Sequence, residues 1–91
     1  MAVGKAVVRN SAGIHVRPSG LIGKAFEDYP GNISLRAHDM ETDLSNVLGI
    51  ISLGLQKGDQ VSVRVEGPDD EAVCARLIEL LEKEYDFPPR K

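Results

Sequence analysis

A histidine and an arginine stand two residues apart, directly before a stretch with helical spacing. The pair is His15 and Arg17, and the apolar positions that follow are Leu21, Ile22, Ala25, Phe26 and Tyr29. This spacing predicts a helix that begins near Pro18 or one turn earlier, because proline is tolerated in a first helical turn. His15 would then stand at or just before the N-terminus of the helix.

A histidine at a helix start could act as a nucleophile toward an anionic group. The free backbone N–H groups and aligned peptide dipoles attract anions and disfavour an imidazolium, so His15 is expected to stay neutral near pH 7. Arg17 adds a planar set of donors that suits a phosphate. Together they could accept a phosphoryl group, which needs mainly positioning and charge stabilisation. On residue types alone, a simpler alternative is favoured by roughly two to one: His15 caps the helix and Arg17 is a solvated charge.

A resemblance to a known family changes this balance, and it rests on two separate blocks of sequence. The first block, residues 13–18, resembles the G-[IL]-H-A-R-P signature of HPr, the histidine-containing phosphocarrier of the bacterial phosphotransferase system. The second block, residues 44–54, resembles the same family at the expected distance and is followed by Lys57-Gly58 and Gly67. The resemblance covers nearly the whole chain.

The resemblance implies a role for each residue of the first block. Nδ1 of His15 would take a phosphoryl group from phosphorylated enzyme I and pass it to the A domain of a sugar-specific enzyme II. Arg17 would stabilise the phosphate, together with the backbone N–H groups of Val16 and Arg17. The docking surface expected beside the histidine consists of Leu21, Val47, Leu48 and Ile51. Such a chain is a phosphoryl-group carrier in sugar transport rather than an autonomous enzyme, and no cofactor is expected.

The sequence departs from the family pattern at positions that bear on partners and regulation. Position 16, usually alanine, is Val16, and Glu27 and Gly49 stand where many carriers have basic residues that meet enzyme I. Asn46 holds the place of the serine that an ATP-dependent kinase phosphorylates in many Gram-positive relatives. Because an amide can cap a helix but cannot accept a phosphoryl group, the serine-type switch is expected to be absent, with Ser45 the nearest hydroxyl.

Two other hypotheses for the function stay open. In the first, the chain is a regulatory module of the nitrogen-branch type, and a kinase, transporter or transcription factor reads the phosphorylation state of His15. In the second, it is a small structural or ligand-binding domain that is not phosphorylated. The sequence does not separate the carrier from the regulator, because both use the same histidine.

Length, charge and cysteine content limit the class of protein. The 91 residues suffice for one domain, residues 1–91, in which residues 85–91 are expected to form a frayed tail. The net charge of −3 argues against nucleic acid as a partner. The sequence has no N-terminal apolar stretch long enough for a signal peptide or membrane insertion, so a cytoplasmic location is expected, and a monomer is the family default. The single Cys74 is expected to be a packed, unreactive side chain.

Hydrophobic periodicity predicts the elements that position the histidine. Residues 47–55 are apolar almost throughout and could form a helix or a buried strand, but Ser45, Asn46 and Gly54 favour a short helix. His38 is interpreted as a turn residue, and no metal site is expected around it. The predicted elements are strands at 2–8, 33–37, 40–44 and 61–65, and helices from near 18 to 28 or 29, at 47–54, and from 68 to about 84.

This order predicts an α+β fold. Three helices must bury their apolar faces against one side of a four-stranded sheet whose other side meets water. A ferredoxin-like arrangement is also consistent with the pattern. The resemblance to HPr implies an open-faced β-sandwich, with an antiparallel sheet and the three helices on one face.

Overall fold

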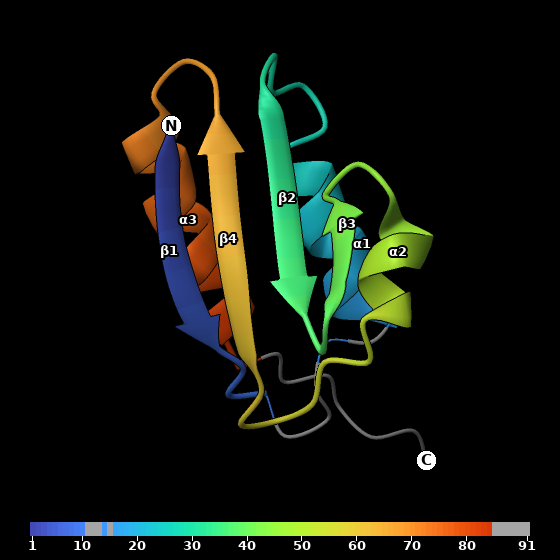
Figure 1. Ribbon diagram of the computed structural model, residues 1–91. Helices are drawn as coiled ribbons and strands as arrows, with labels where there is room; N and C mark the ends of the chain where they lie inside the picture. Colours follow the sequence, from blue (N-terminus) through green and yellow to red (C-terminus); the bar gives the residue numbers. More distant parts are fainter. Residues whose placement is uncertain (11–13, 15, 85–91) are drawn as a thin grey trace.

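The computed structural model describes residues 1–10, 14 and 16–84 and contains a four-stranded sheet with three helices (Figure 1). His15 and the predicted tail, residues 85–91, lie outside the described residues. The elements are β1 (Ala2–Val7), α1 (Val16–Ala25), β2 (Asn32–Ala37), β3 (Met40–Asp43), α2 (Val47–Ser52), β4 (Gln60–Glu66) and α3 (Asp70–Glu82).

The strands pair in the order β1-β4-β2-β3, and every neighbouring pair is antiparallel. β4, the last strand in the chain, therefore lies between β1 and β2. The expected alternation is confirmed in this strand: Val61, Val63 and Val65 are buried, whereas Ser62 and Arg64 are exposed. Burial of every second residue is what a sheet with one covered face and one open face requires.

The covered face is aliphatic. In Figure 1, α1 and α3 lie behind the sheet and α2 lies beside β3. Each fully buried large side chain contributes about 1.5–3 kcal/mol relative to an exposed position. The single cysteine, Cys74, is buried among these residues, as expected. The helices contribute the buried residues Ile22 from α1, Ile50 from α2, and Cys74, Leu77 and Leu81 from α3. The α+β fold with an open-faced antiparallel sheet is thereby confirmed.

α1 ends earlier than predicted. It stops at Ala25, and the next residues form a turn in which Tyr29 N–H donates to the Phe26 carbonyl at 3.0 Å. The Tyr29 hydroxyl then donates to the Pro68 carbonyl oxygen at 2.7 Å, on the loop between β4 and α3. Phe26 and Tyr29 still pack against the core, but from a turn rather than from a longer helix. Helical spacing of apolar residues therefore predicted the packing correctly and the helix end incorrectly.

α3 begins two residues later than predicted. Pro68 belongs to the preceding loop, and the N-cap residue Asp69 has a left-handed backbone with φ 52°. The first turn of α3 contains Asp70 and Glu71, whose charges complement the positive end of the helix dipole. The helix ends at Glu82 rather than near Glu84.

Two glycines allow the chain to approach itself closely beside Tyr29. A Cβ on Gly31 would meet the Glu66 carbonyl oxygen and would lie 2.9 Å from Gly67 Cα. Gly67 also has φ 151°, a conformation that other residues rarely adopt. The start of β2 and the end of β4 can therefore meet only because neither position carries a side chain.

This close approach predicts that Gly31→Ala lowers the free energy of unfolding by about 1–3 kcal/mol, because backbone atoms have to move to admit the methyl group. Urea unfolding followed by circular dichroism measures the change. The matched control is Gly20→Ala, since nothing lies within 4 Å of a Cβ at that position of α1. We expect the control to raise the free energy of unfolding by about 0.5–1 kcal/mol. Equal stabilities for the two variants would contradict the prediction.

Candidate functional site

The N-terminus of α1 is the centre of the predicted site. α1 begins at Val16, so the N–H groups of Val16 and Arg17 belong to the first turn, where backbone donors have no intrahelical partner. That turn carries no acidic residue, in contrast to the first turn of α3 with Asp70 and Glu71. Within the described residues, the positive end of α1 is therefore not compensated by a carboxylate of its own, and it can attract an external anion.

The residue on the other side of His15 is fixed in the core. Ile14 is 2% exposed, and its N–H donates to the Leu55 carbonyl oxygen at 2.9 Å. His15 therefore connects a buried, hydrogen-bonded residue to the first residue of a helix. The roles predicted for His15 itself and for the Arg17 guanidinium fall outside the described residues and side chains, and they stay predictions.

The turn that follows Leu55 is held by Asp59. The Asp59 carboxylate accepts the backbone N–H of Gln56 at 2.8 Å and contacts His38 Nε2 at 2.9 Å. The Gln56 hydrogen bond and then His38 hold the pKa of Asp59 below its ordinary value of 3.8. Its carbonyl oxygen accepts the N–H of Val8 at 2.9 Å. One residue thus joins the end of β1, the turn between β2 and β3, and the turn beside the site.

His38 is a turn residue, as predicted, but it has a partner that was not predicted from the sequence. His38 and Asp39 both have left-handed backbones, with φ 53° and 63°, which a tight hairpin of the type I′ class requires at its two central positions. The contact with Asp59 spans 21 residues of sequence. The one feature of the sequence that could have indicated this contact is a histidine at a turn position where asparagine or glycine is usual.

α2 is a helix, as the flanking residues predicted, and Asn46 is its N-cap. The Asn46 side chain accepts the backbone N–H of Gly49 at 3.0 Å. A Cβ on Gly49 would collide with Thr42 Oγ1, so α2 lies close against β3 and a larger residue at position 49 would require the Thr42 side chain to shift. The neighbouring Ser45 hydroxyl donates to the Asp43 carboxylate at 2.8 Å.

The expected docking residues differ in exposure. Leu21 is 52% exposed and Leu48 is 74% exposed, whereas Val47 and Ile51 are half-buried. In the first turn of α2, Val47 therefore belongs partly to the core and Leu48 belongs to the surface. Val47 Cγ2 would lie 3.0 Å from a Cβ on Gly23, so Val47 packs α2 against α1 while Leu48 faces solvent.

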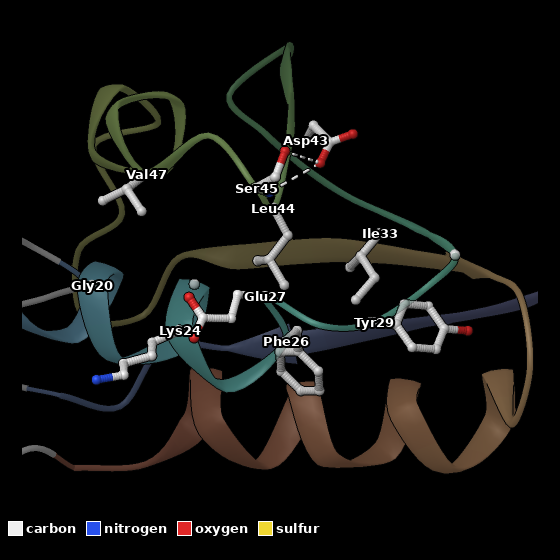
Figure 2. A pocket seen from close by; sticks show the side chains of 12 residues that line it. Gly20, Lys24, Phe26, Glu27, Tyr29, Ile33, Asp43, Leu44, Ser45 and Val47 are labelled. Carbon is white, nitrogen blue, oxygen red and sulfur yellow. Dashed lines mark hydrogen bonds between the residues drawn. The ribbon is translucent and has the colours of Figure 1, made fainter.

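A groove that the sequence analysis did not anticipate runs beside this surface (Figure 2). Its volume is about 510 Å³. Lys24 and Glu27 lie on its α1 side, and the hydrogen-bonded pair Asp43 and Ser45 lies on the other side. The apolar side chains of its lining include Phe26, Ile33, Leu44 and Val47. The groove is made of segments far apart in sequence, so no local pattern could reveal it.

Other kinds of site find no support in the described part of the chain. No group of three or more histidine, cysteine, aspartate or glutamate residues there could hold a metal ion. None of the described helices is long and apolar enough to cross a membrane.

The structure defines the class of small open-faced α+β sandwiches, and comparison with known proteins identifies the family. Residues 3–83 match the family model of the PTS HPr component phosphorylation site. The chain therefore belongs to the HPr family of phosphocarriers of the bacterial phosphotransferase system, as its two motifs indicated.

Individual relatives agree with this assignment. The phosphocarrier protein HPr of Chlamydia trachomatis is 36% identical over 73 residues, which cover 80% of this chain and 67% of that protein. The crystal structure of an HPr from Thermoanaerobacter tengcongensis has a TM-score of 0.81 at 26% identity, covering 89% of this chain and 91% of that one. For an HPr from Bacillus anthracis the TM-score is 0.83 at 20% identity, covering 89% and 96%, and this likeness supports the fold.

The contacts of Asp59 predict a pH dependence of stability. A pKa that is lower in the folded than in the unfolded chain contributes stability above the unfolded value, near 3.8, and this contribution is lost as the pH falls through the folded pKa. Asp59→Asn should therefore be less stable than the parent at pH 7, and the difference should shrink as the pH falls below 3.8 and through the lower folded pKa. Urea unfolding at a series of pH values measures it. Asp28→Asn, which changes an exposed carboxylate, is the control; a pH-independent deficit in Asp59→Asn would contradict the prediction.

Ser19 predicts an effect of the opposite sign. Its side chain is 0% exposed, and among the described residues its hydroxyl has no hydrogen-bond partner. Because a buried hydroxyl without a partner carries an uncompensated desolvation cost, Ser19→Ala should raise the free energy of unfolding by about 1 kcal/mol. Thermal and urea unfolding measure the change. A destabilised Ser19→Ala would show that the hydroxyl has a partner in solution.

Proposed function

We propose that this chain carries a phosphoryl group on Nδ1 of His15, receives it from phosphorylated enzyme I, and passes it to the A domain of a sugar-specific enzyme II. The observation that carries the proposal is the family match over residues 3–83, within which His15 directly precedes the first residue of α1. The uncompensated positive end of α1 supports the same assignment on electrostatic grounds.

The transfer requires a neutral imidazole and a stabilised phosphoryl group. The Nδ1 lone pair of His15 attacks phosphorus while the bond from phosphorus to enzyme I breaks, and the proton on Nε2 stays in place. The N–H groups of Val16 and Arg17 and the Arg17 guanidinium then share the negative charge of the phosphoryl oxygens. Transfer to the next protein repeats these steps in reverse, so the chain needs little more than positioning and charge.

The docking surface proposed beside His15 is small. It consists of Leu21, Val47, Leu48 and Ile51, of which Leu21 and Leu48 are the most exposed. A carrier must leave each partner after transfer, and a limited apolar patch suits short-lived complexes. The chain would act in the cytoplasm as a monomer. Asn46, at the regulatory position, caps α2 and cannot accept a phosphoryl group. Ser45 is the nearest hydroxyl, and it donates a hydrogen bond to the Asp43 carboxylate. We therefore expect no serine-type switch.

The two histidines of the chain provide a matched test. Each protein is incubated with labelled phosphoenolpyruvate and enzyme I. We expect the parent protein and His38→Ala each to gain one acid-labile phosphate per chain. His15→Ala should stay unmodified. Acid lability identifies phosphohistidine, because phosphoserine survives acid. Uptake by His15→Ala equal to that of the parent would overturn the proposal.

A second step separates transport from regulation. The phosphorylated chain is mixed with a panel of enzyme II A domains, and the label is followed by gel electrophoresis. Transfer to an A domain supports the carrier of sugar transport. Phosphorylation of His15 without transfer to any of them would instead favour the regulatory alternative, in which another protein reads the phosphorylated state.

A further inference from the structure

The open face of the sheet, on the side away from the helices, gathers three basic side chains around two serines. Lys5 of β1 and Arg36 of β2 are both in register with Ser62 of β4, one on each side of it. Arg64, the next outward residue of β4, is in register with Ser34 of β2. All five positions have the same orientation, because residues directly opposite one another in a sheet share a face.

The short serine side chains leave a hollow among the longer ones. It has a volume of about 320 Å³ and is lined by side chains that include the three basic residues, both serines, Val3 and Glu41. A flat sheet face usually offers no such depression, whereas this volume lies at the lower end of the range for small-molecule sites. The two hydroxyls supply further hydrogen bonds at its floor.

The charge of the hollow is opposite to that of the whole chain. Its lining contains three basic residues and one acidic residue, Glu41, in a chain whose net charge is −3. Among the described residues, the ion pairs lie elsewhere, between the Met1 amino group and Asp70 and between His38 and Asp59. Glu41 of β3 is in register with Arg36 and balances part of this charge. The three basic residues still exceed the one carboxylate of the lining, and a bound anion would reduce the remaining repulsion.

The chemistry of the face selects the kind of anion. Single-stranded nucleic acid needs aromatic side chains for stacking, but the described aromatic residues, Phe26 and Tyr29, pack against the core on the helical side. Recognition of an anionic membrane surface typically uses four to eight basic residues. Lys5 and Arg36 start from strands two places apart, about 10 Å, which is a span that one phosphate group does not fill.

We propose that the open face binds a small soluble molecule with two or more phosphate groups, held by Lys5, Arg36 and Arg64 above Ser34 and Ser62. The arginines can each make paired hydrogen bonds to phosphate oxygens, and Lys5 adds a point charge. This site is separate from the phosphoryl acceptor, because it is built from strand residues on the face opposite the helices.

The test is an NMR titration of the full chain with inorganic pyrophosphate at constant ionic strength. We expect amide shifts in residues 3–5, 34–36 and 62–64. Arg36→Gln and Arg64→Gln should each raise the dissociation constant at least fivefold. The control is Arg76→Gln, an exposed arginine on α3, which should bind as the parent does.

Three results would overturn the proposal. The first is a set of shifts confined to residues 14–20, which would assign the anion to the N-terminus of α1. The second is an equal dissociation constant for Arg64→Gln and Arg76→Gln, which would make the basic residues a solvated surface. The third is binding to phosphatidylserine vesicles that depends on Arg36 and Arg64 without any response to pyrophosphate, which would assign the face to a membrane.

Discussion

The burial of one face of β4 is the constraint on which the rest of the structure depends. Val61, Val63 and Val65 point to the same side of a strand that has neighbours on both edges, so helices have to cover that side. The connections between β1 and β2 and between β3 and β4 each contain a helix, because each joins strands separated by another strand. α3 then covers β1 and β4 with Leu77 and Leu81. The outward residues of the same strand, Ser62 and Arg64, are left to the open face.

This framework determines where the proposed phosphoryl acceptor, His15, is attached. Val8, just after β1, donates its N–H to the Asp59 carbonyl, and the buried Ile14 donates its N–H to the Leu55 carbonyl. Both acceptors lie just before β4. The helix that must cover the sheet therefore starts directly after His15, and its N-terminal N–H groups, with no acidic residue in the first turn, suit an anion. The same helix packs its apolar side against the core and offers its N-terminal N–H groups to the proposed phosphoryl group.

The sequence predicted local patterns well and long-range contacts poorly. Alternation located the strands to within about one residue, since each side chain in a strand reports directly on the face it occupies. The end of α1 was predicted too late, because Phe26 and Tyr29 keep helical spacing while the Tyr29 hydroxyl binds a distant carbonyl. The pairing of His38 with Asp59 and the glycine contact at Gly31 depend on segments that only the fold brings together. The prediction of His15 as the phosphoryl acceptor came from a motif resemblance, since residue types alone favoured a plain helix cap.

The site of phosphate attachment tests the central claim most directly. Correlation of ³¹P with ring protons by NMR, on the chain phosphorylated by enzyme I, identifies both the histidine and the ring nitrogen. We predict a phosphate on Nδ1 of His15, accompanied by shifts of the amide protons of Val16 and Arg17 as they bind the new oxygens. His38, whose Nε2 contacts the Asp59 carboxylate, should keep its resonances unchanged. A phosphate on His38, or one on His15 that leaves both amide protons unshifted, would contradict the assignment of the α1 N-terminus as the phosphoryl site.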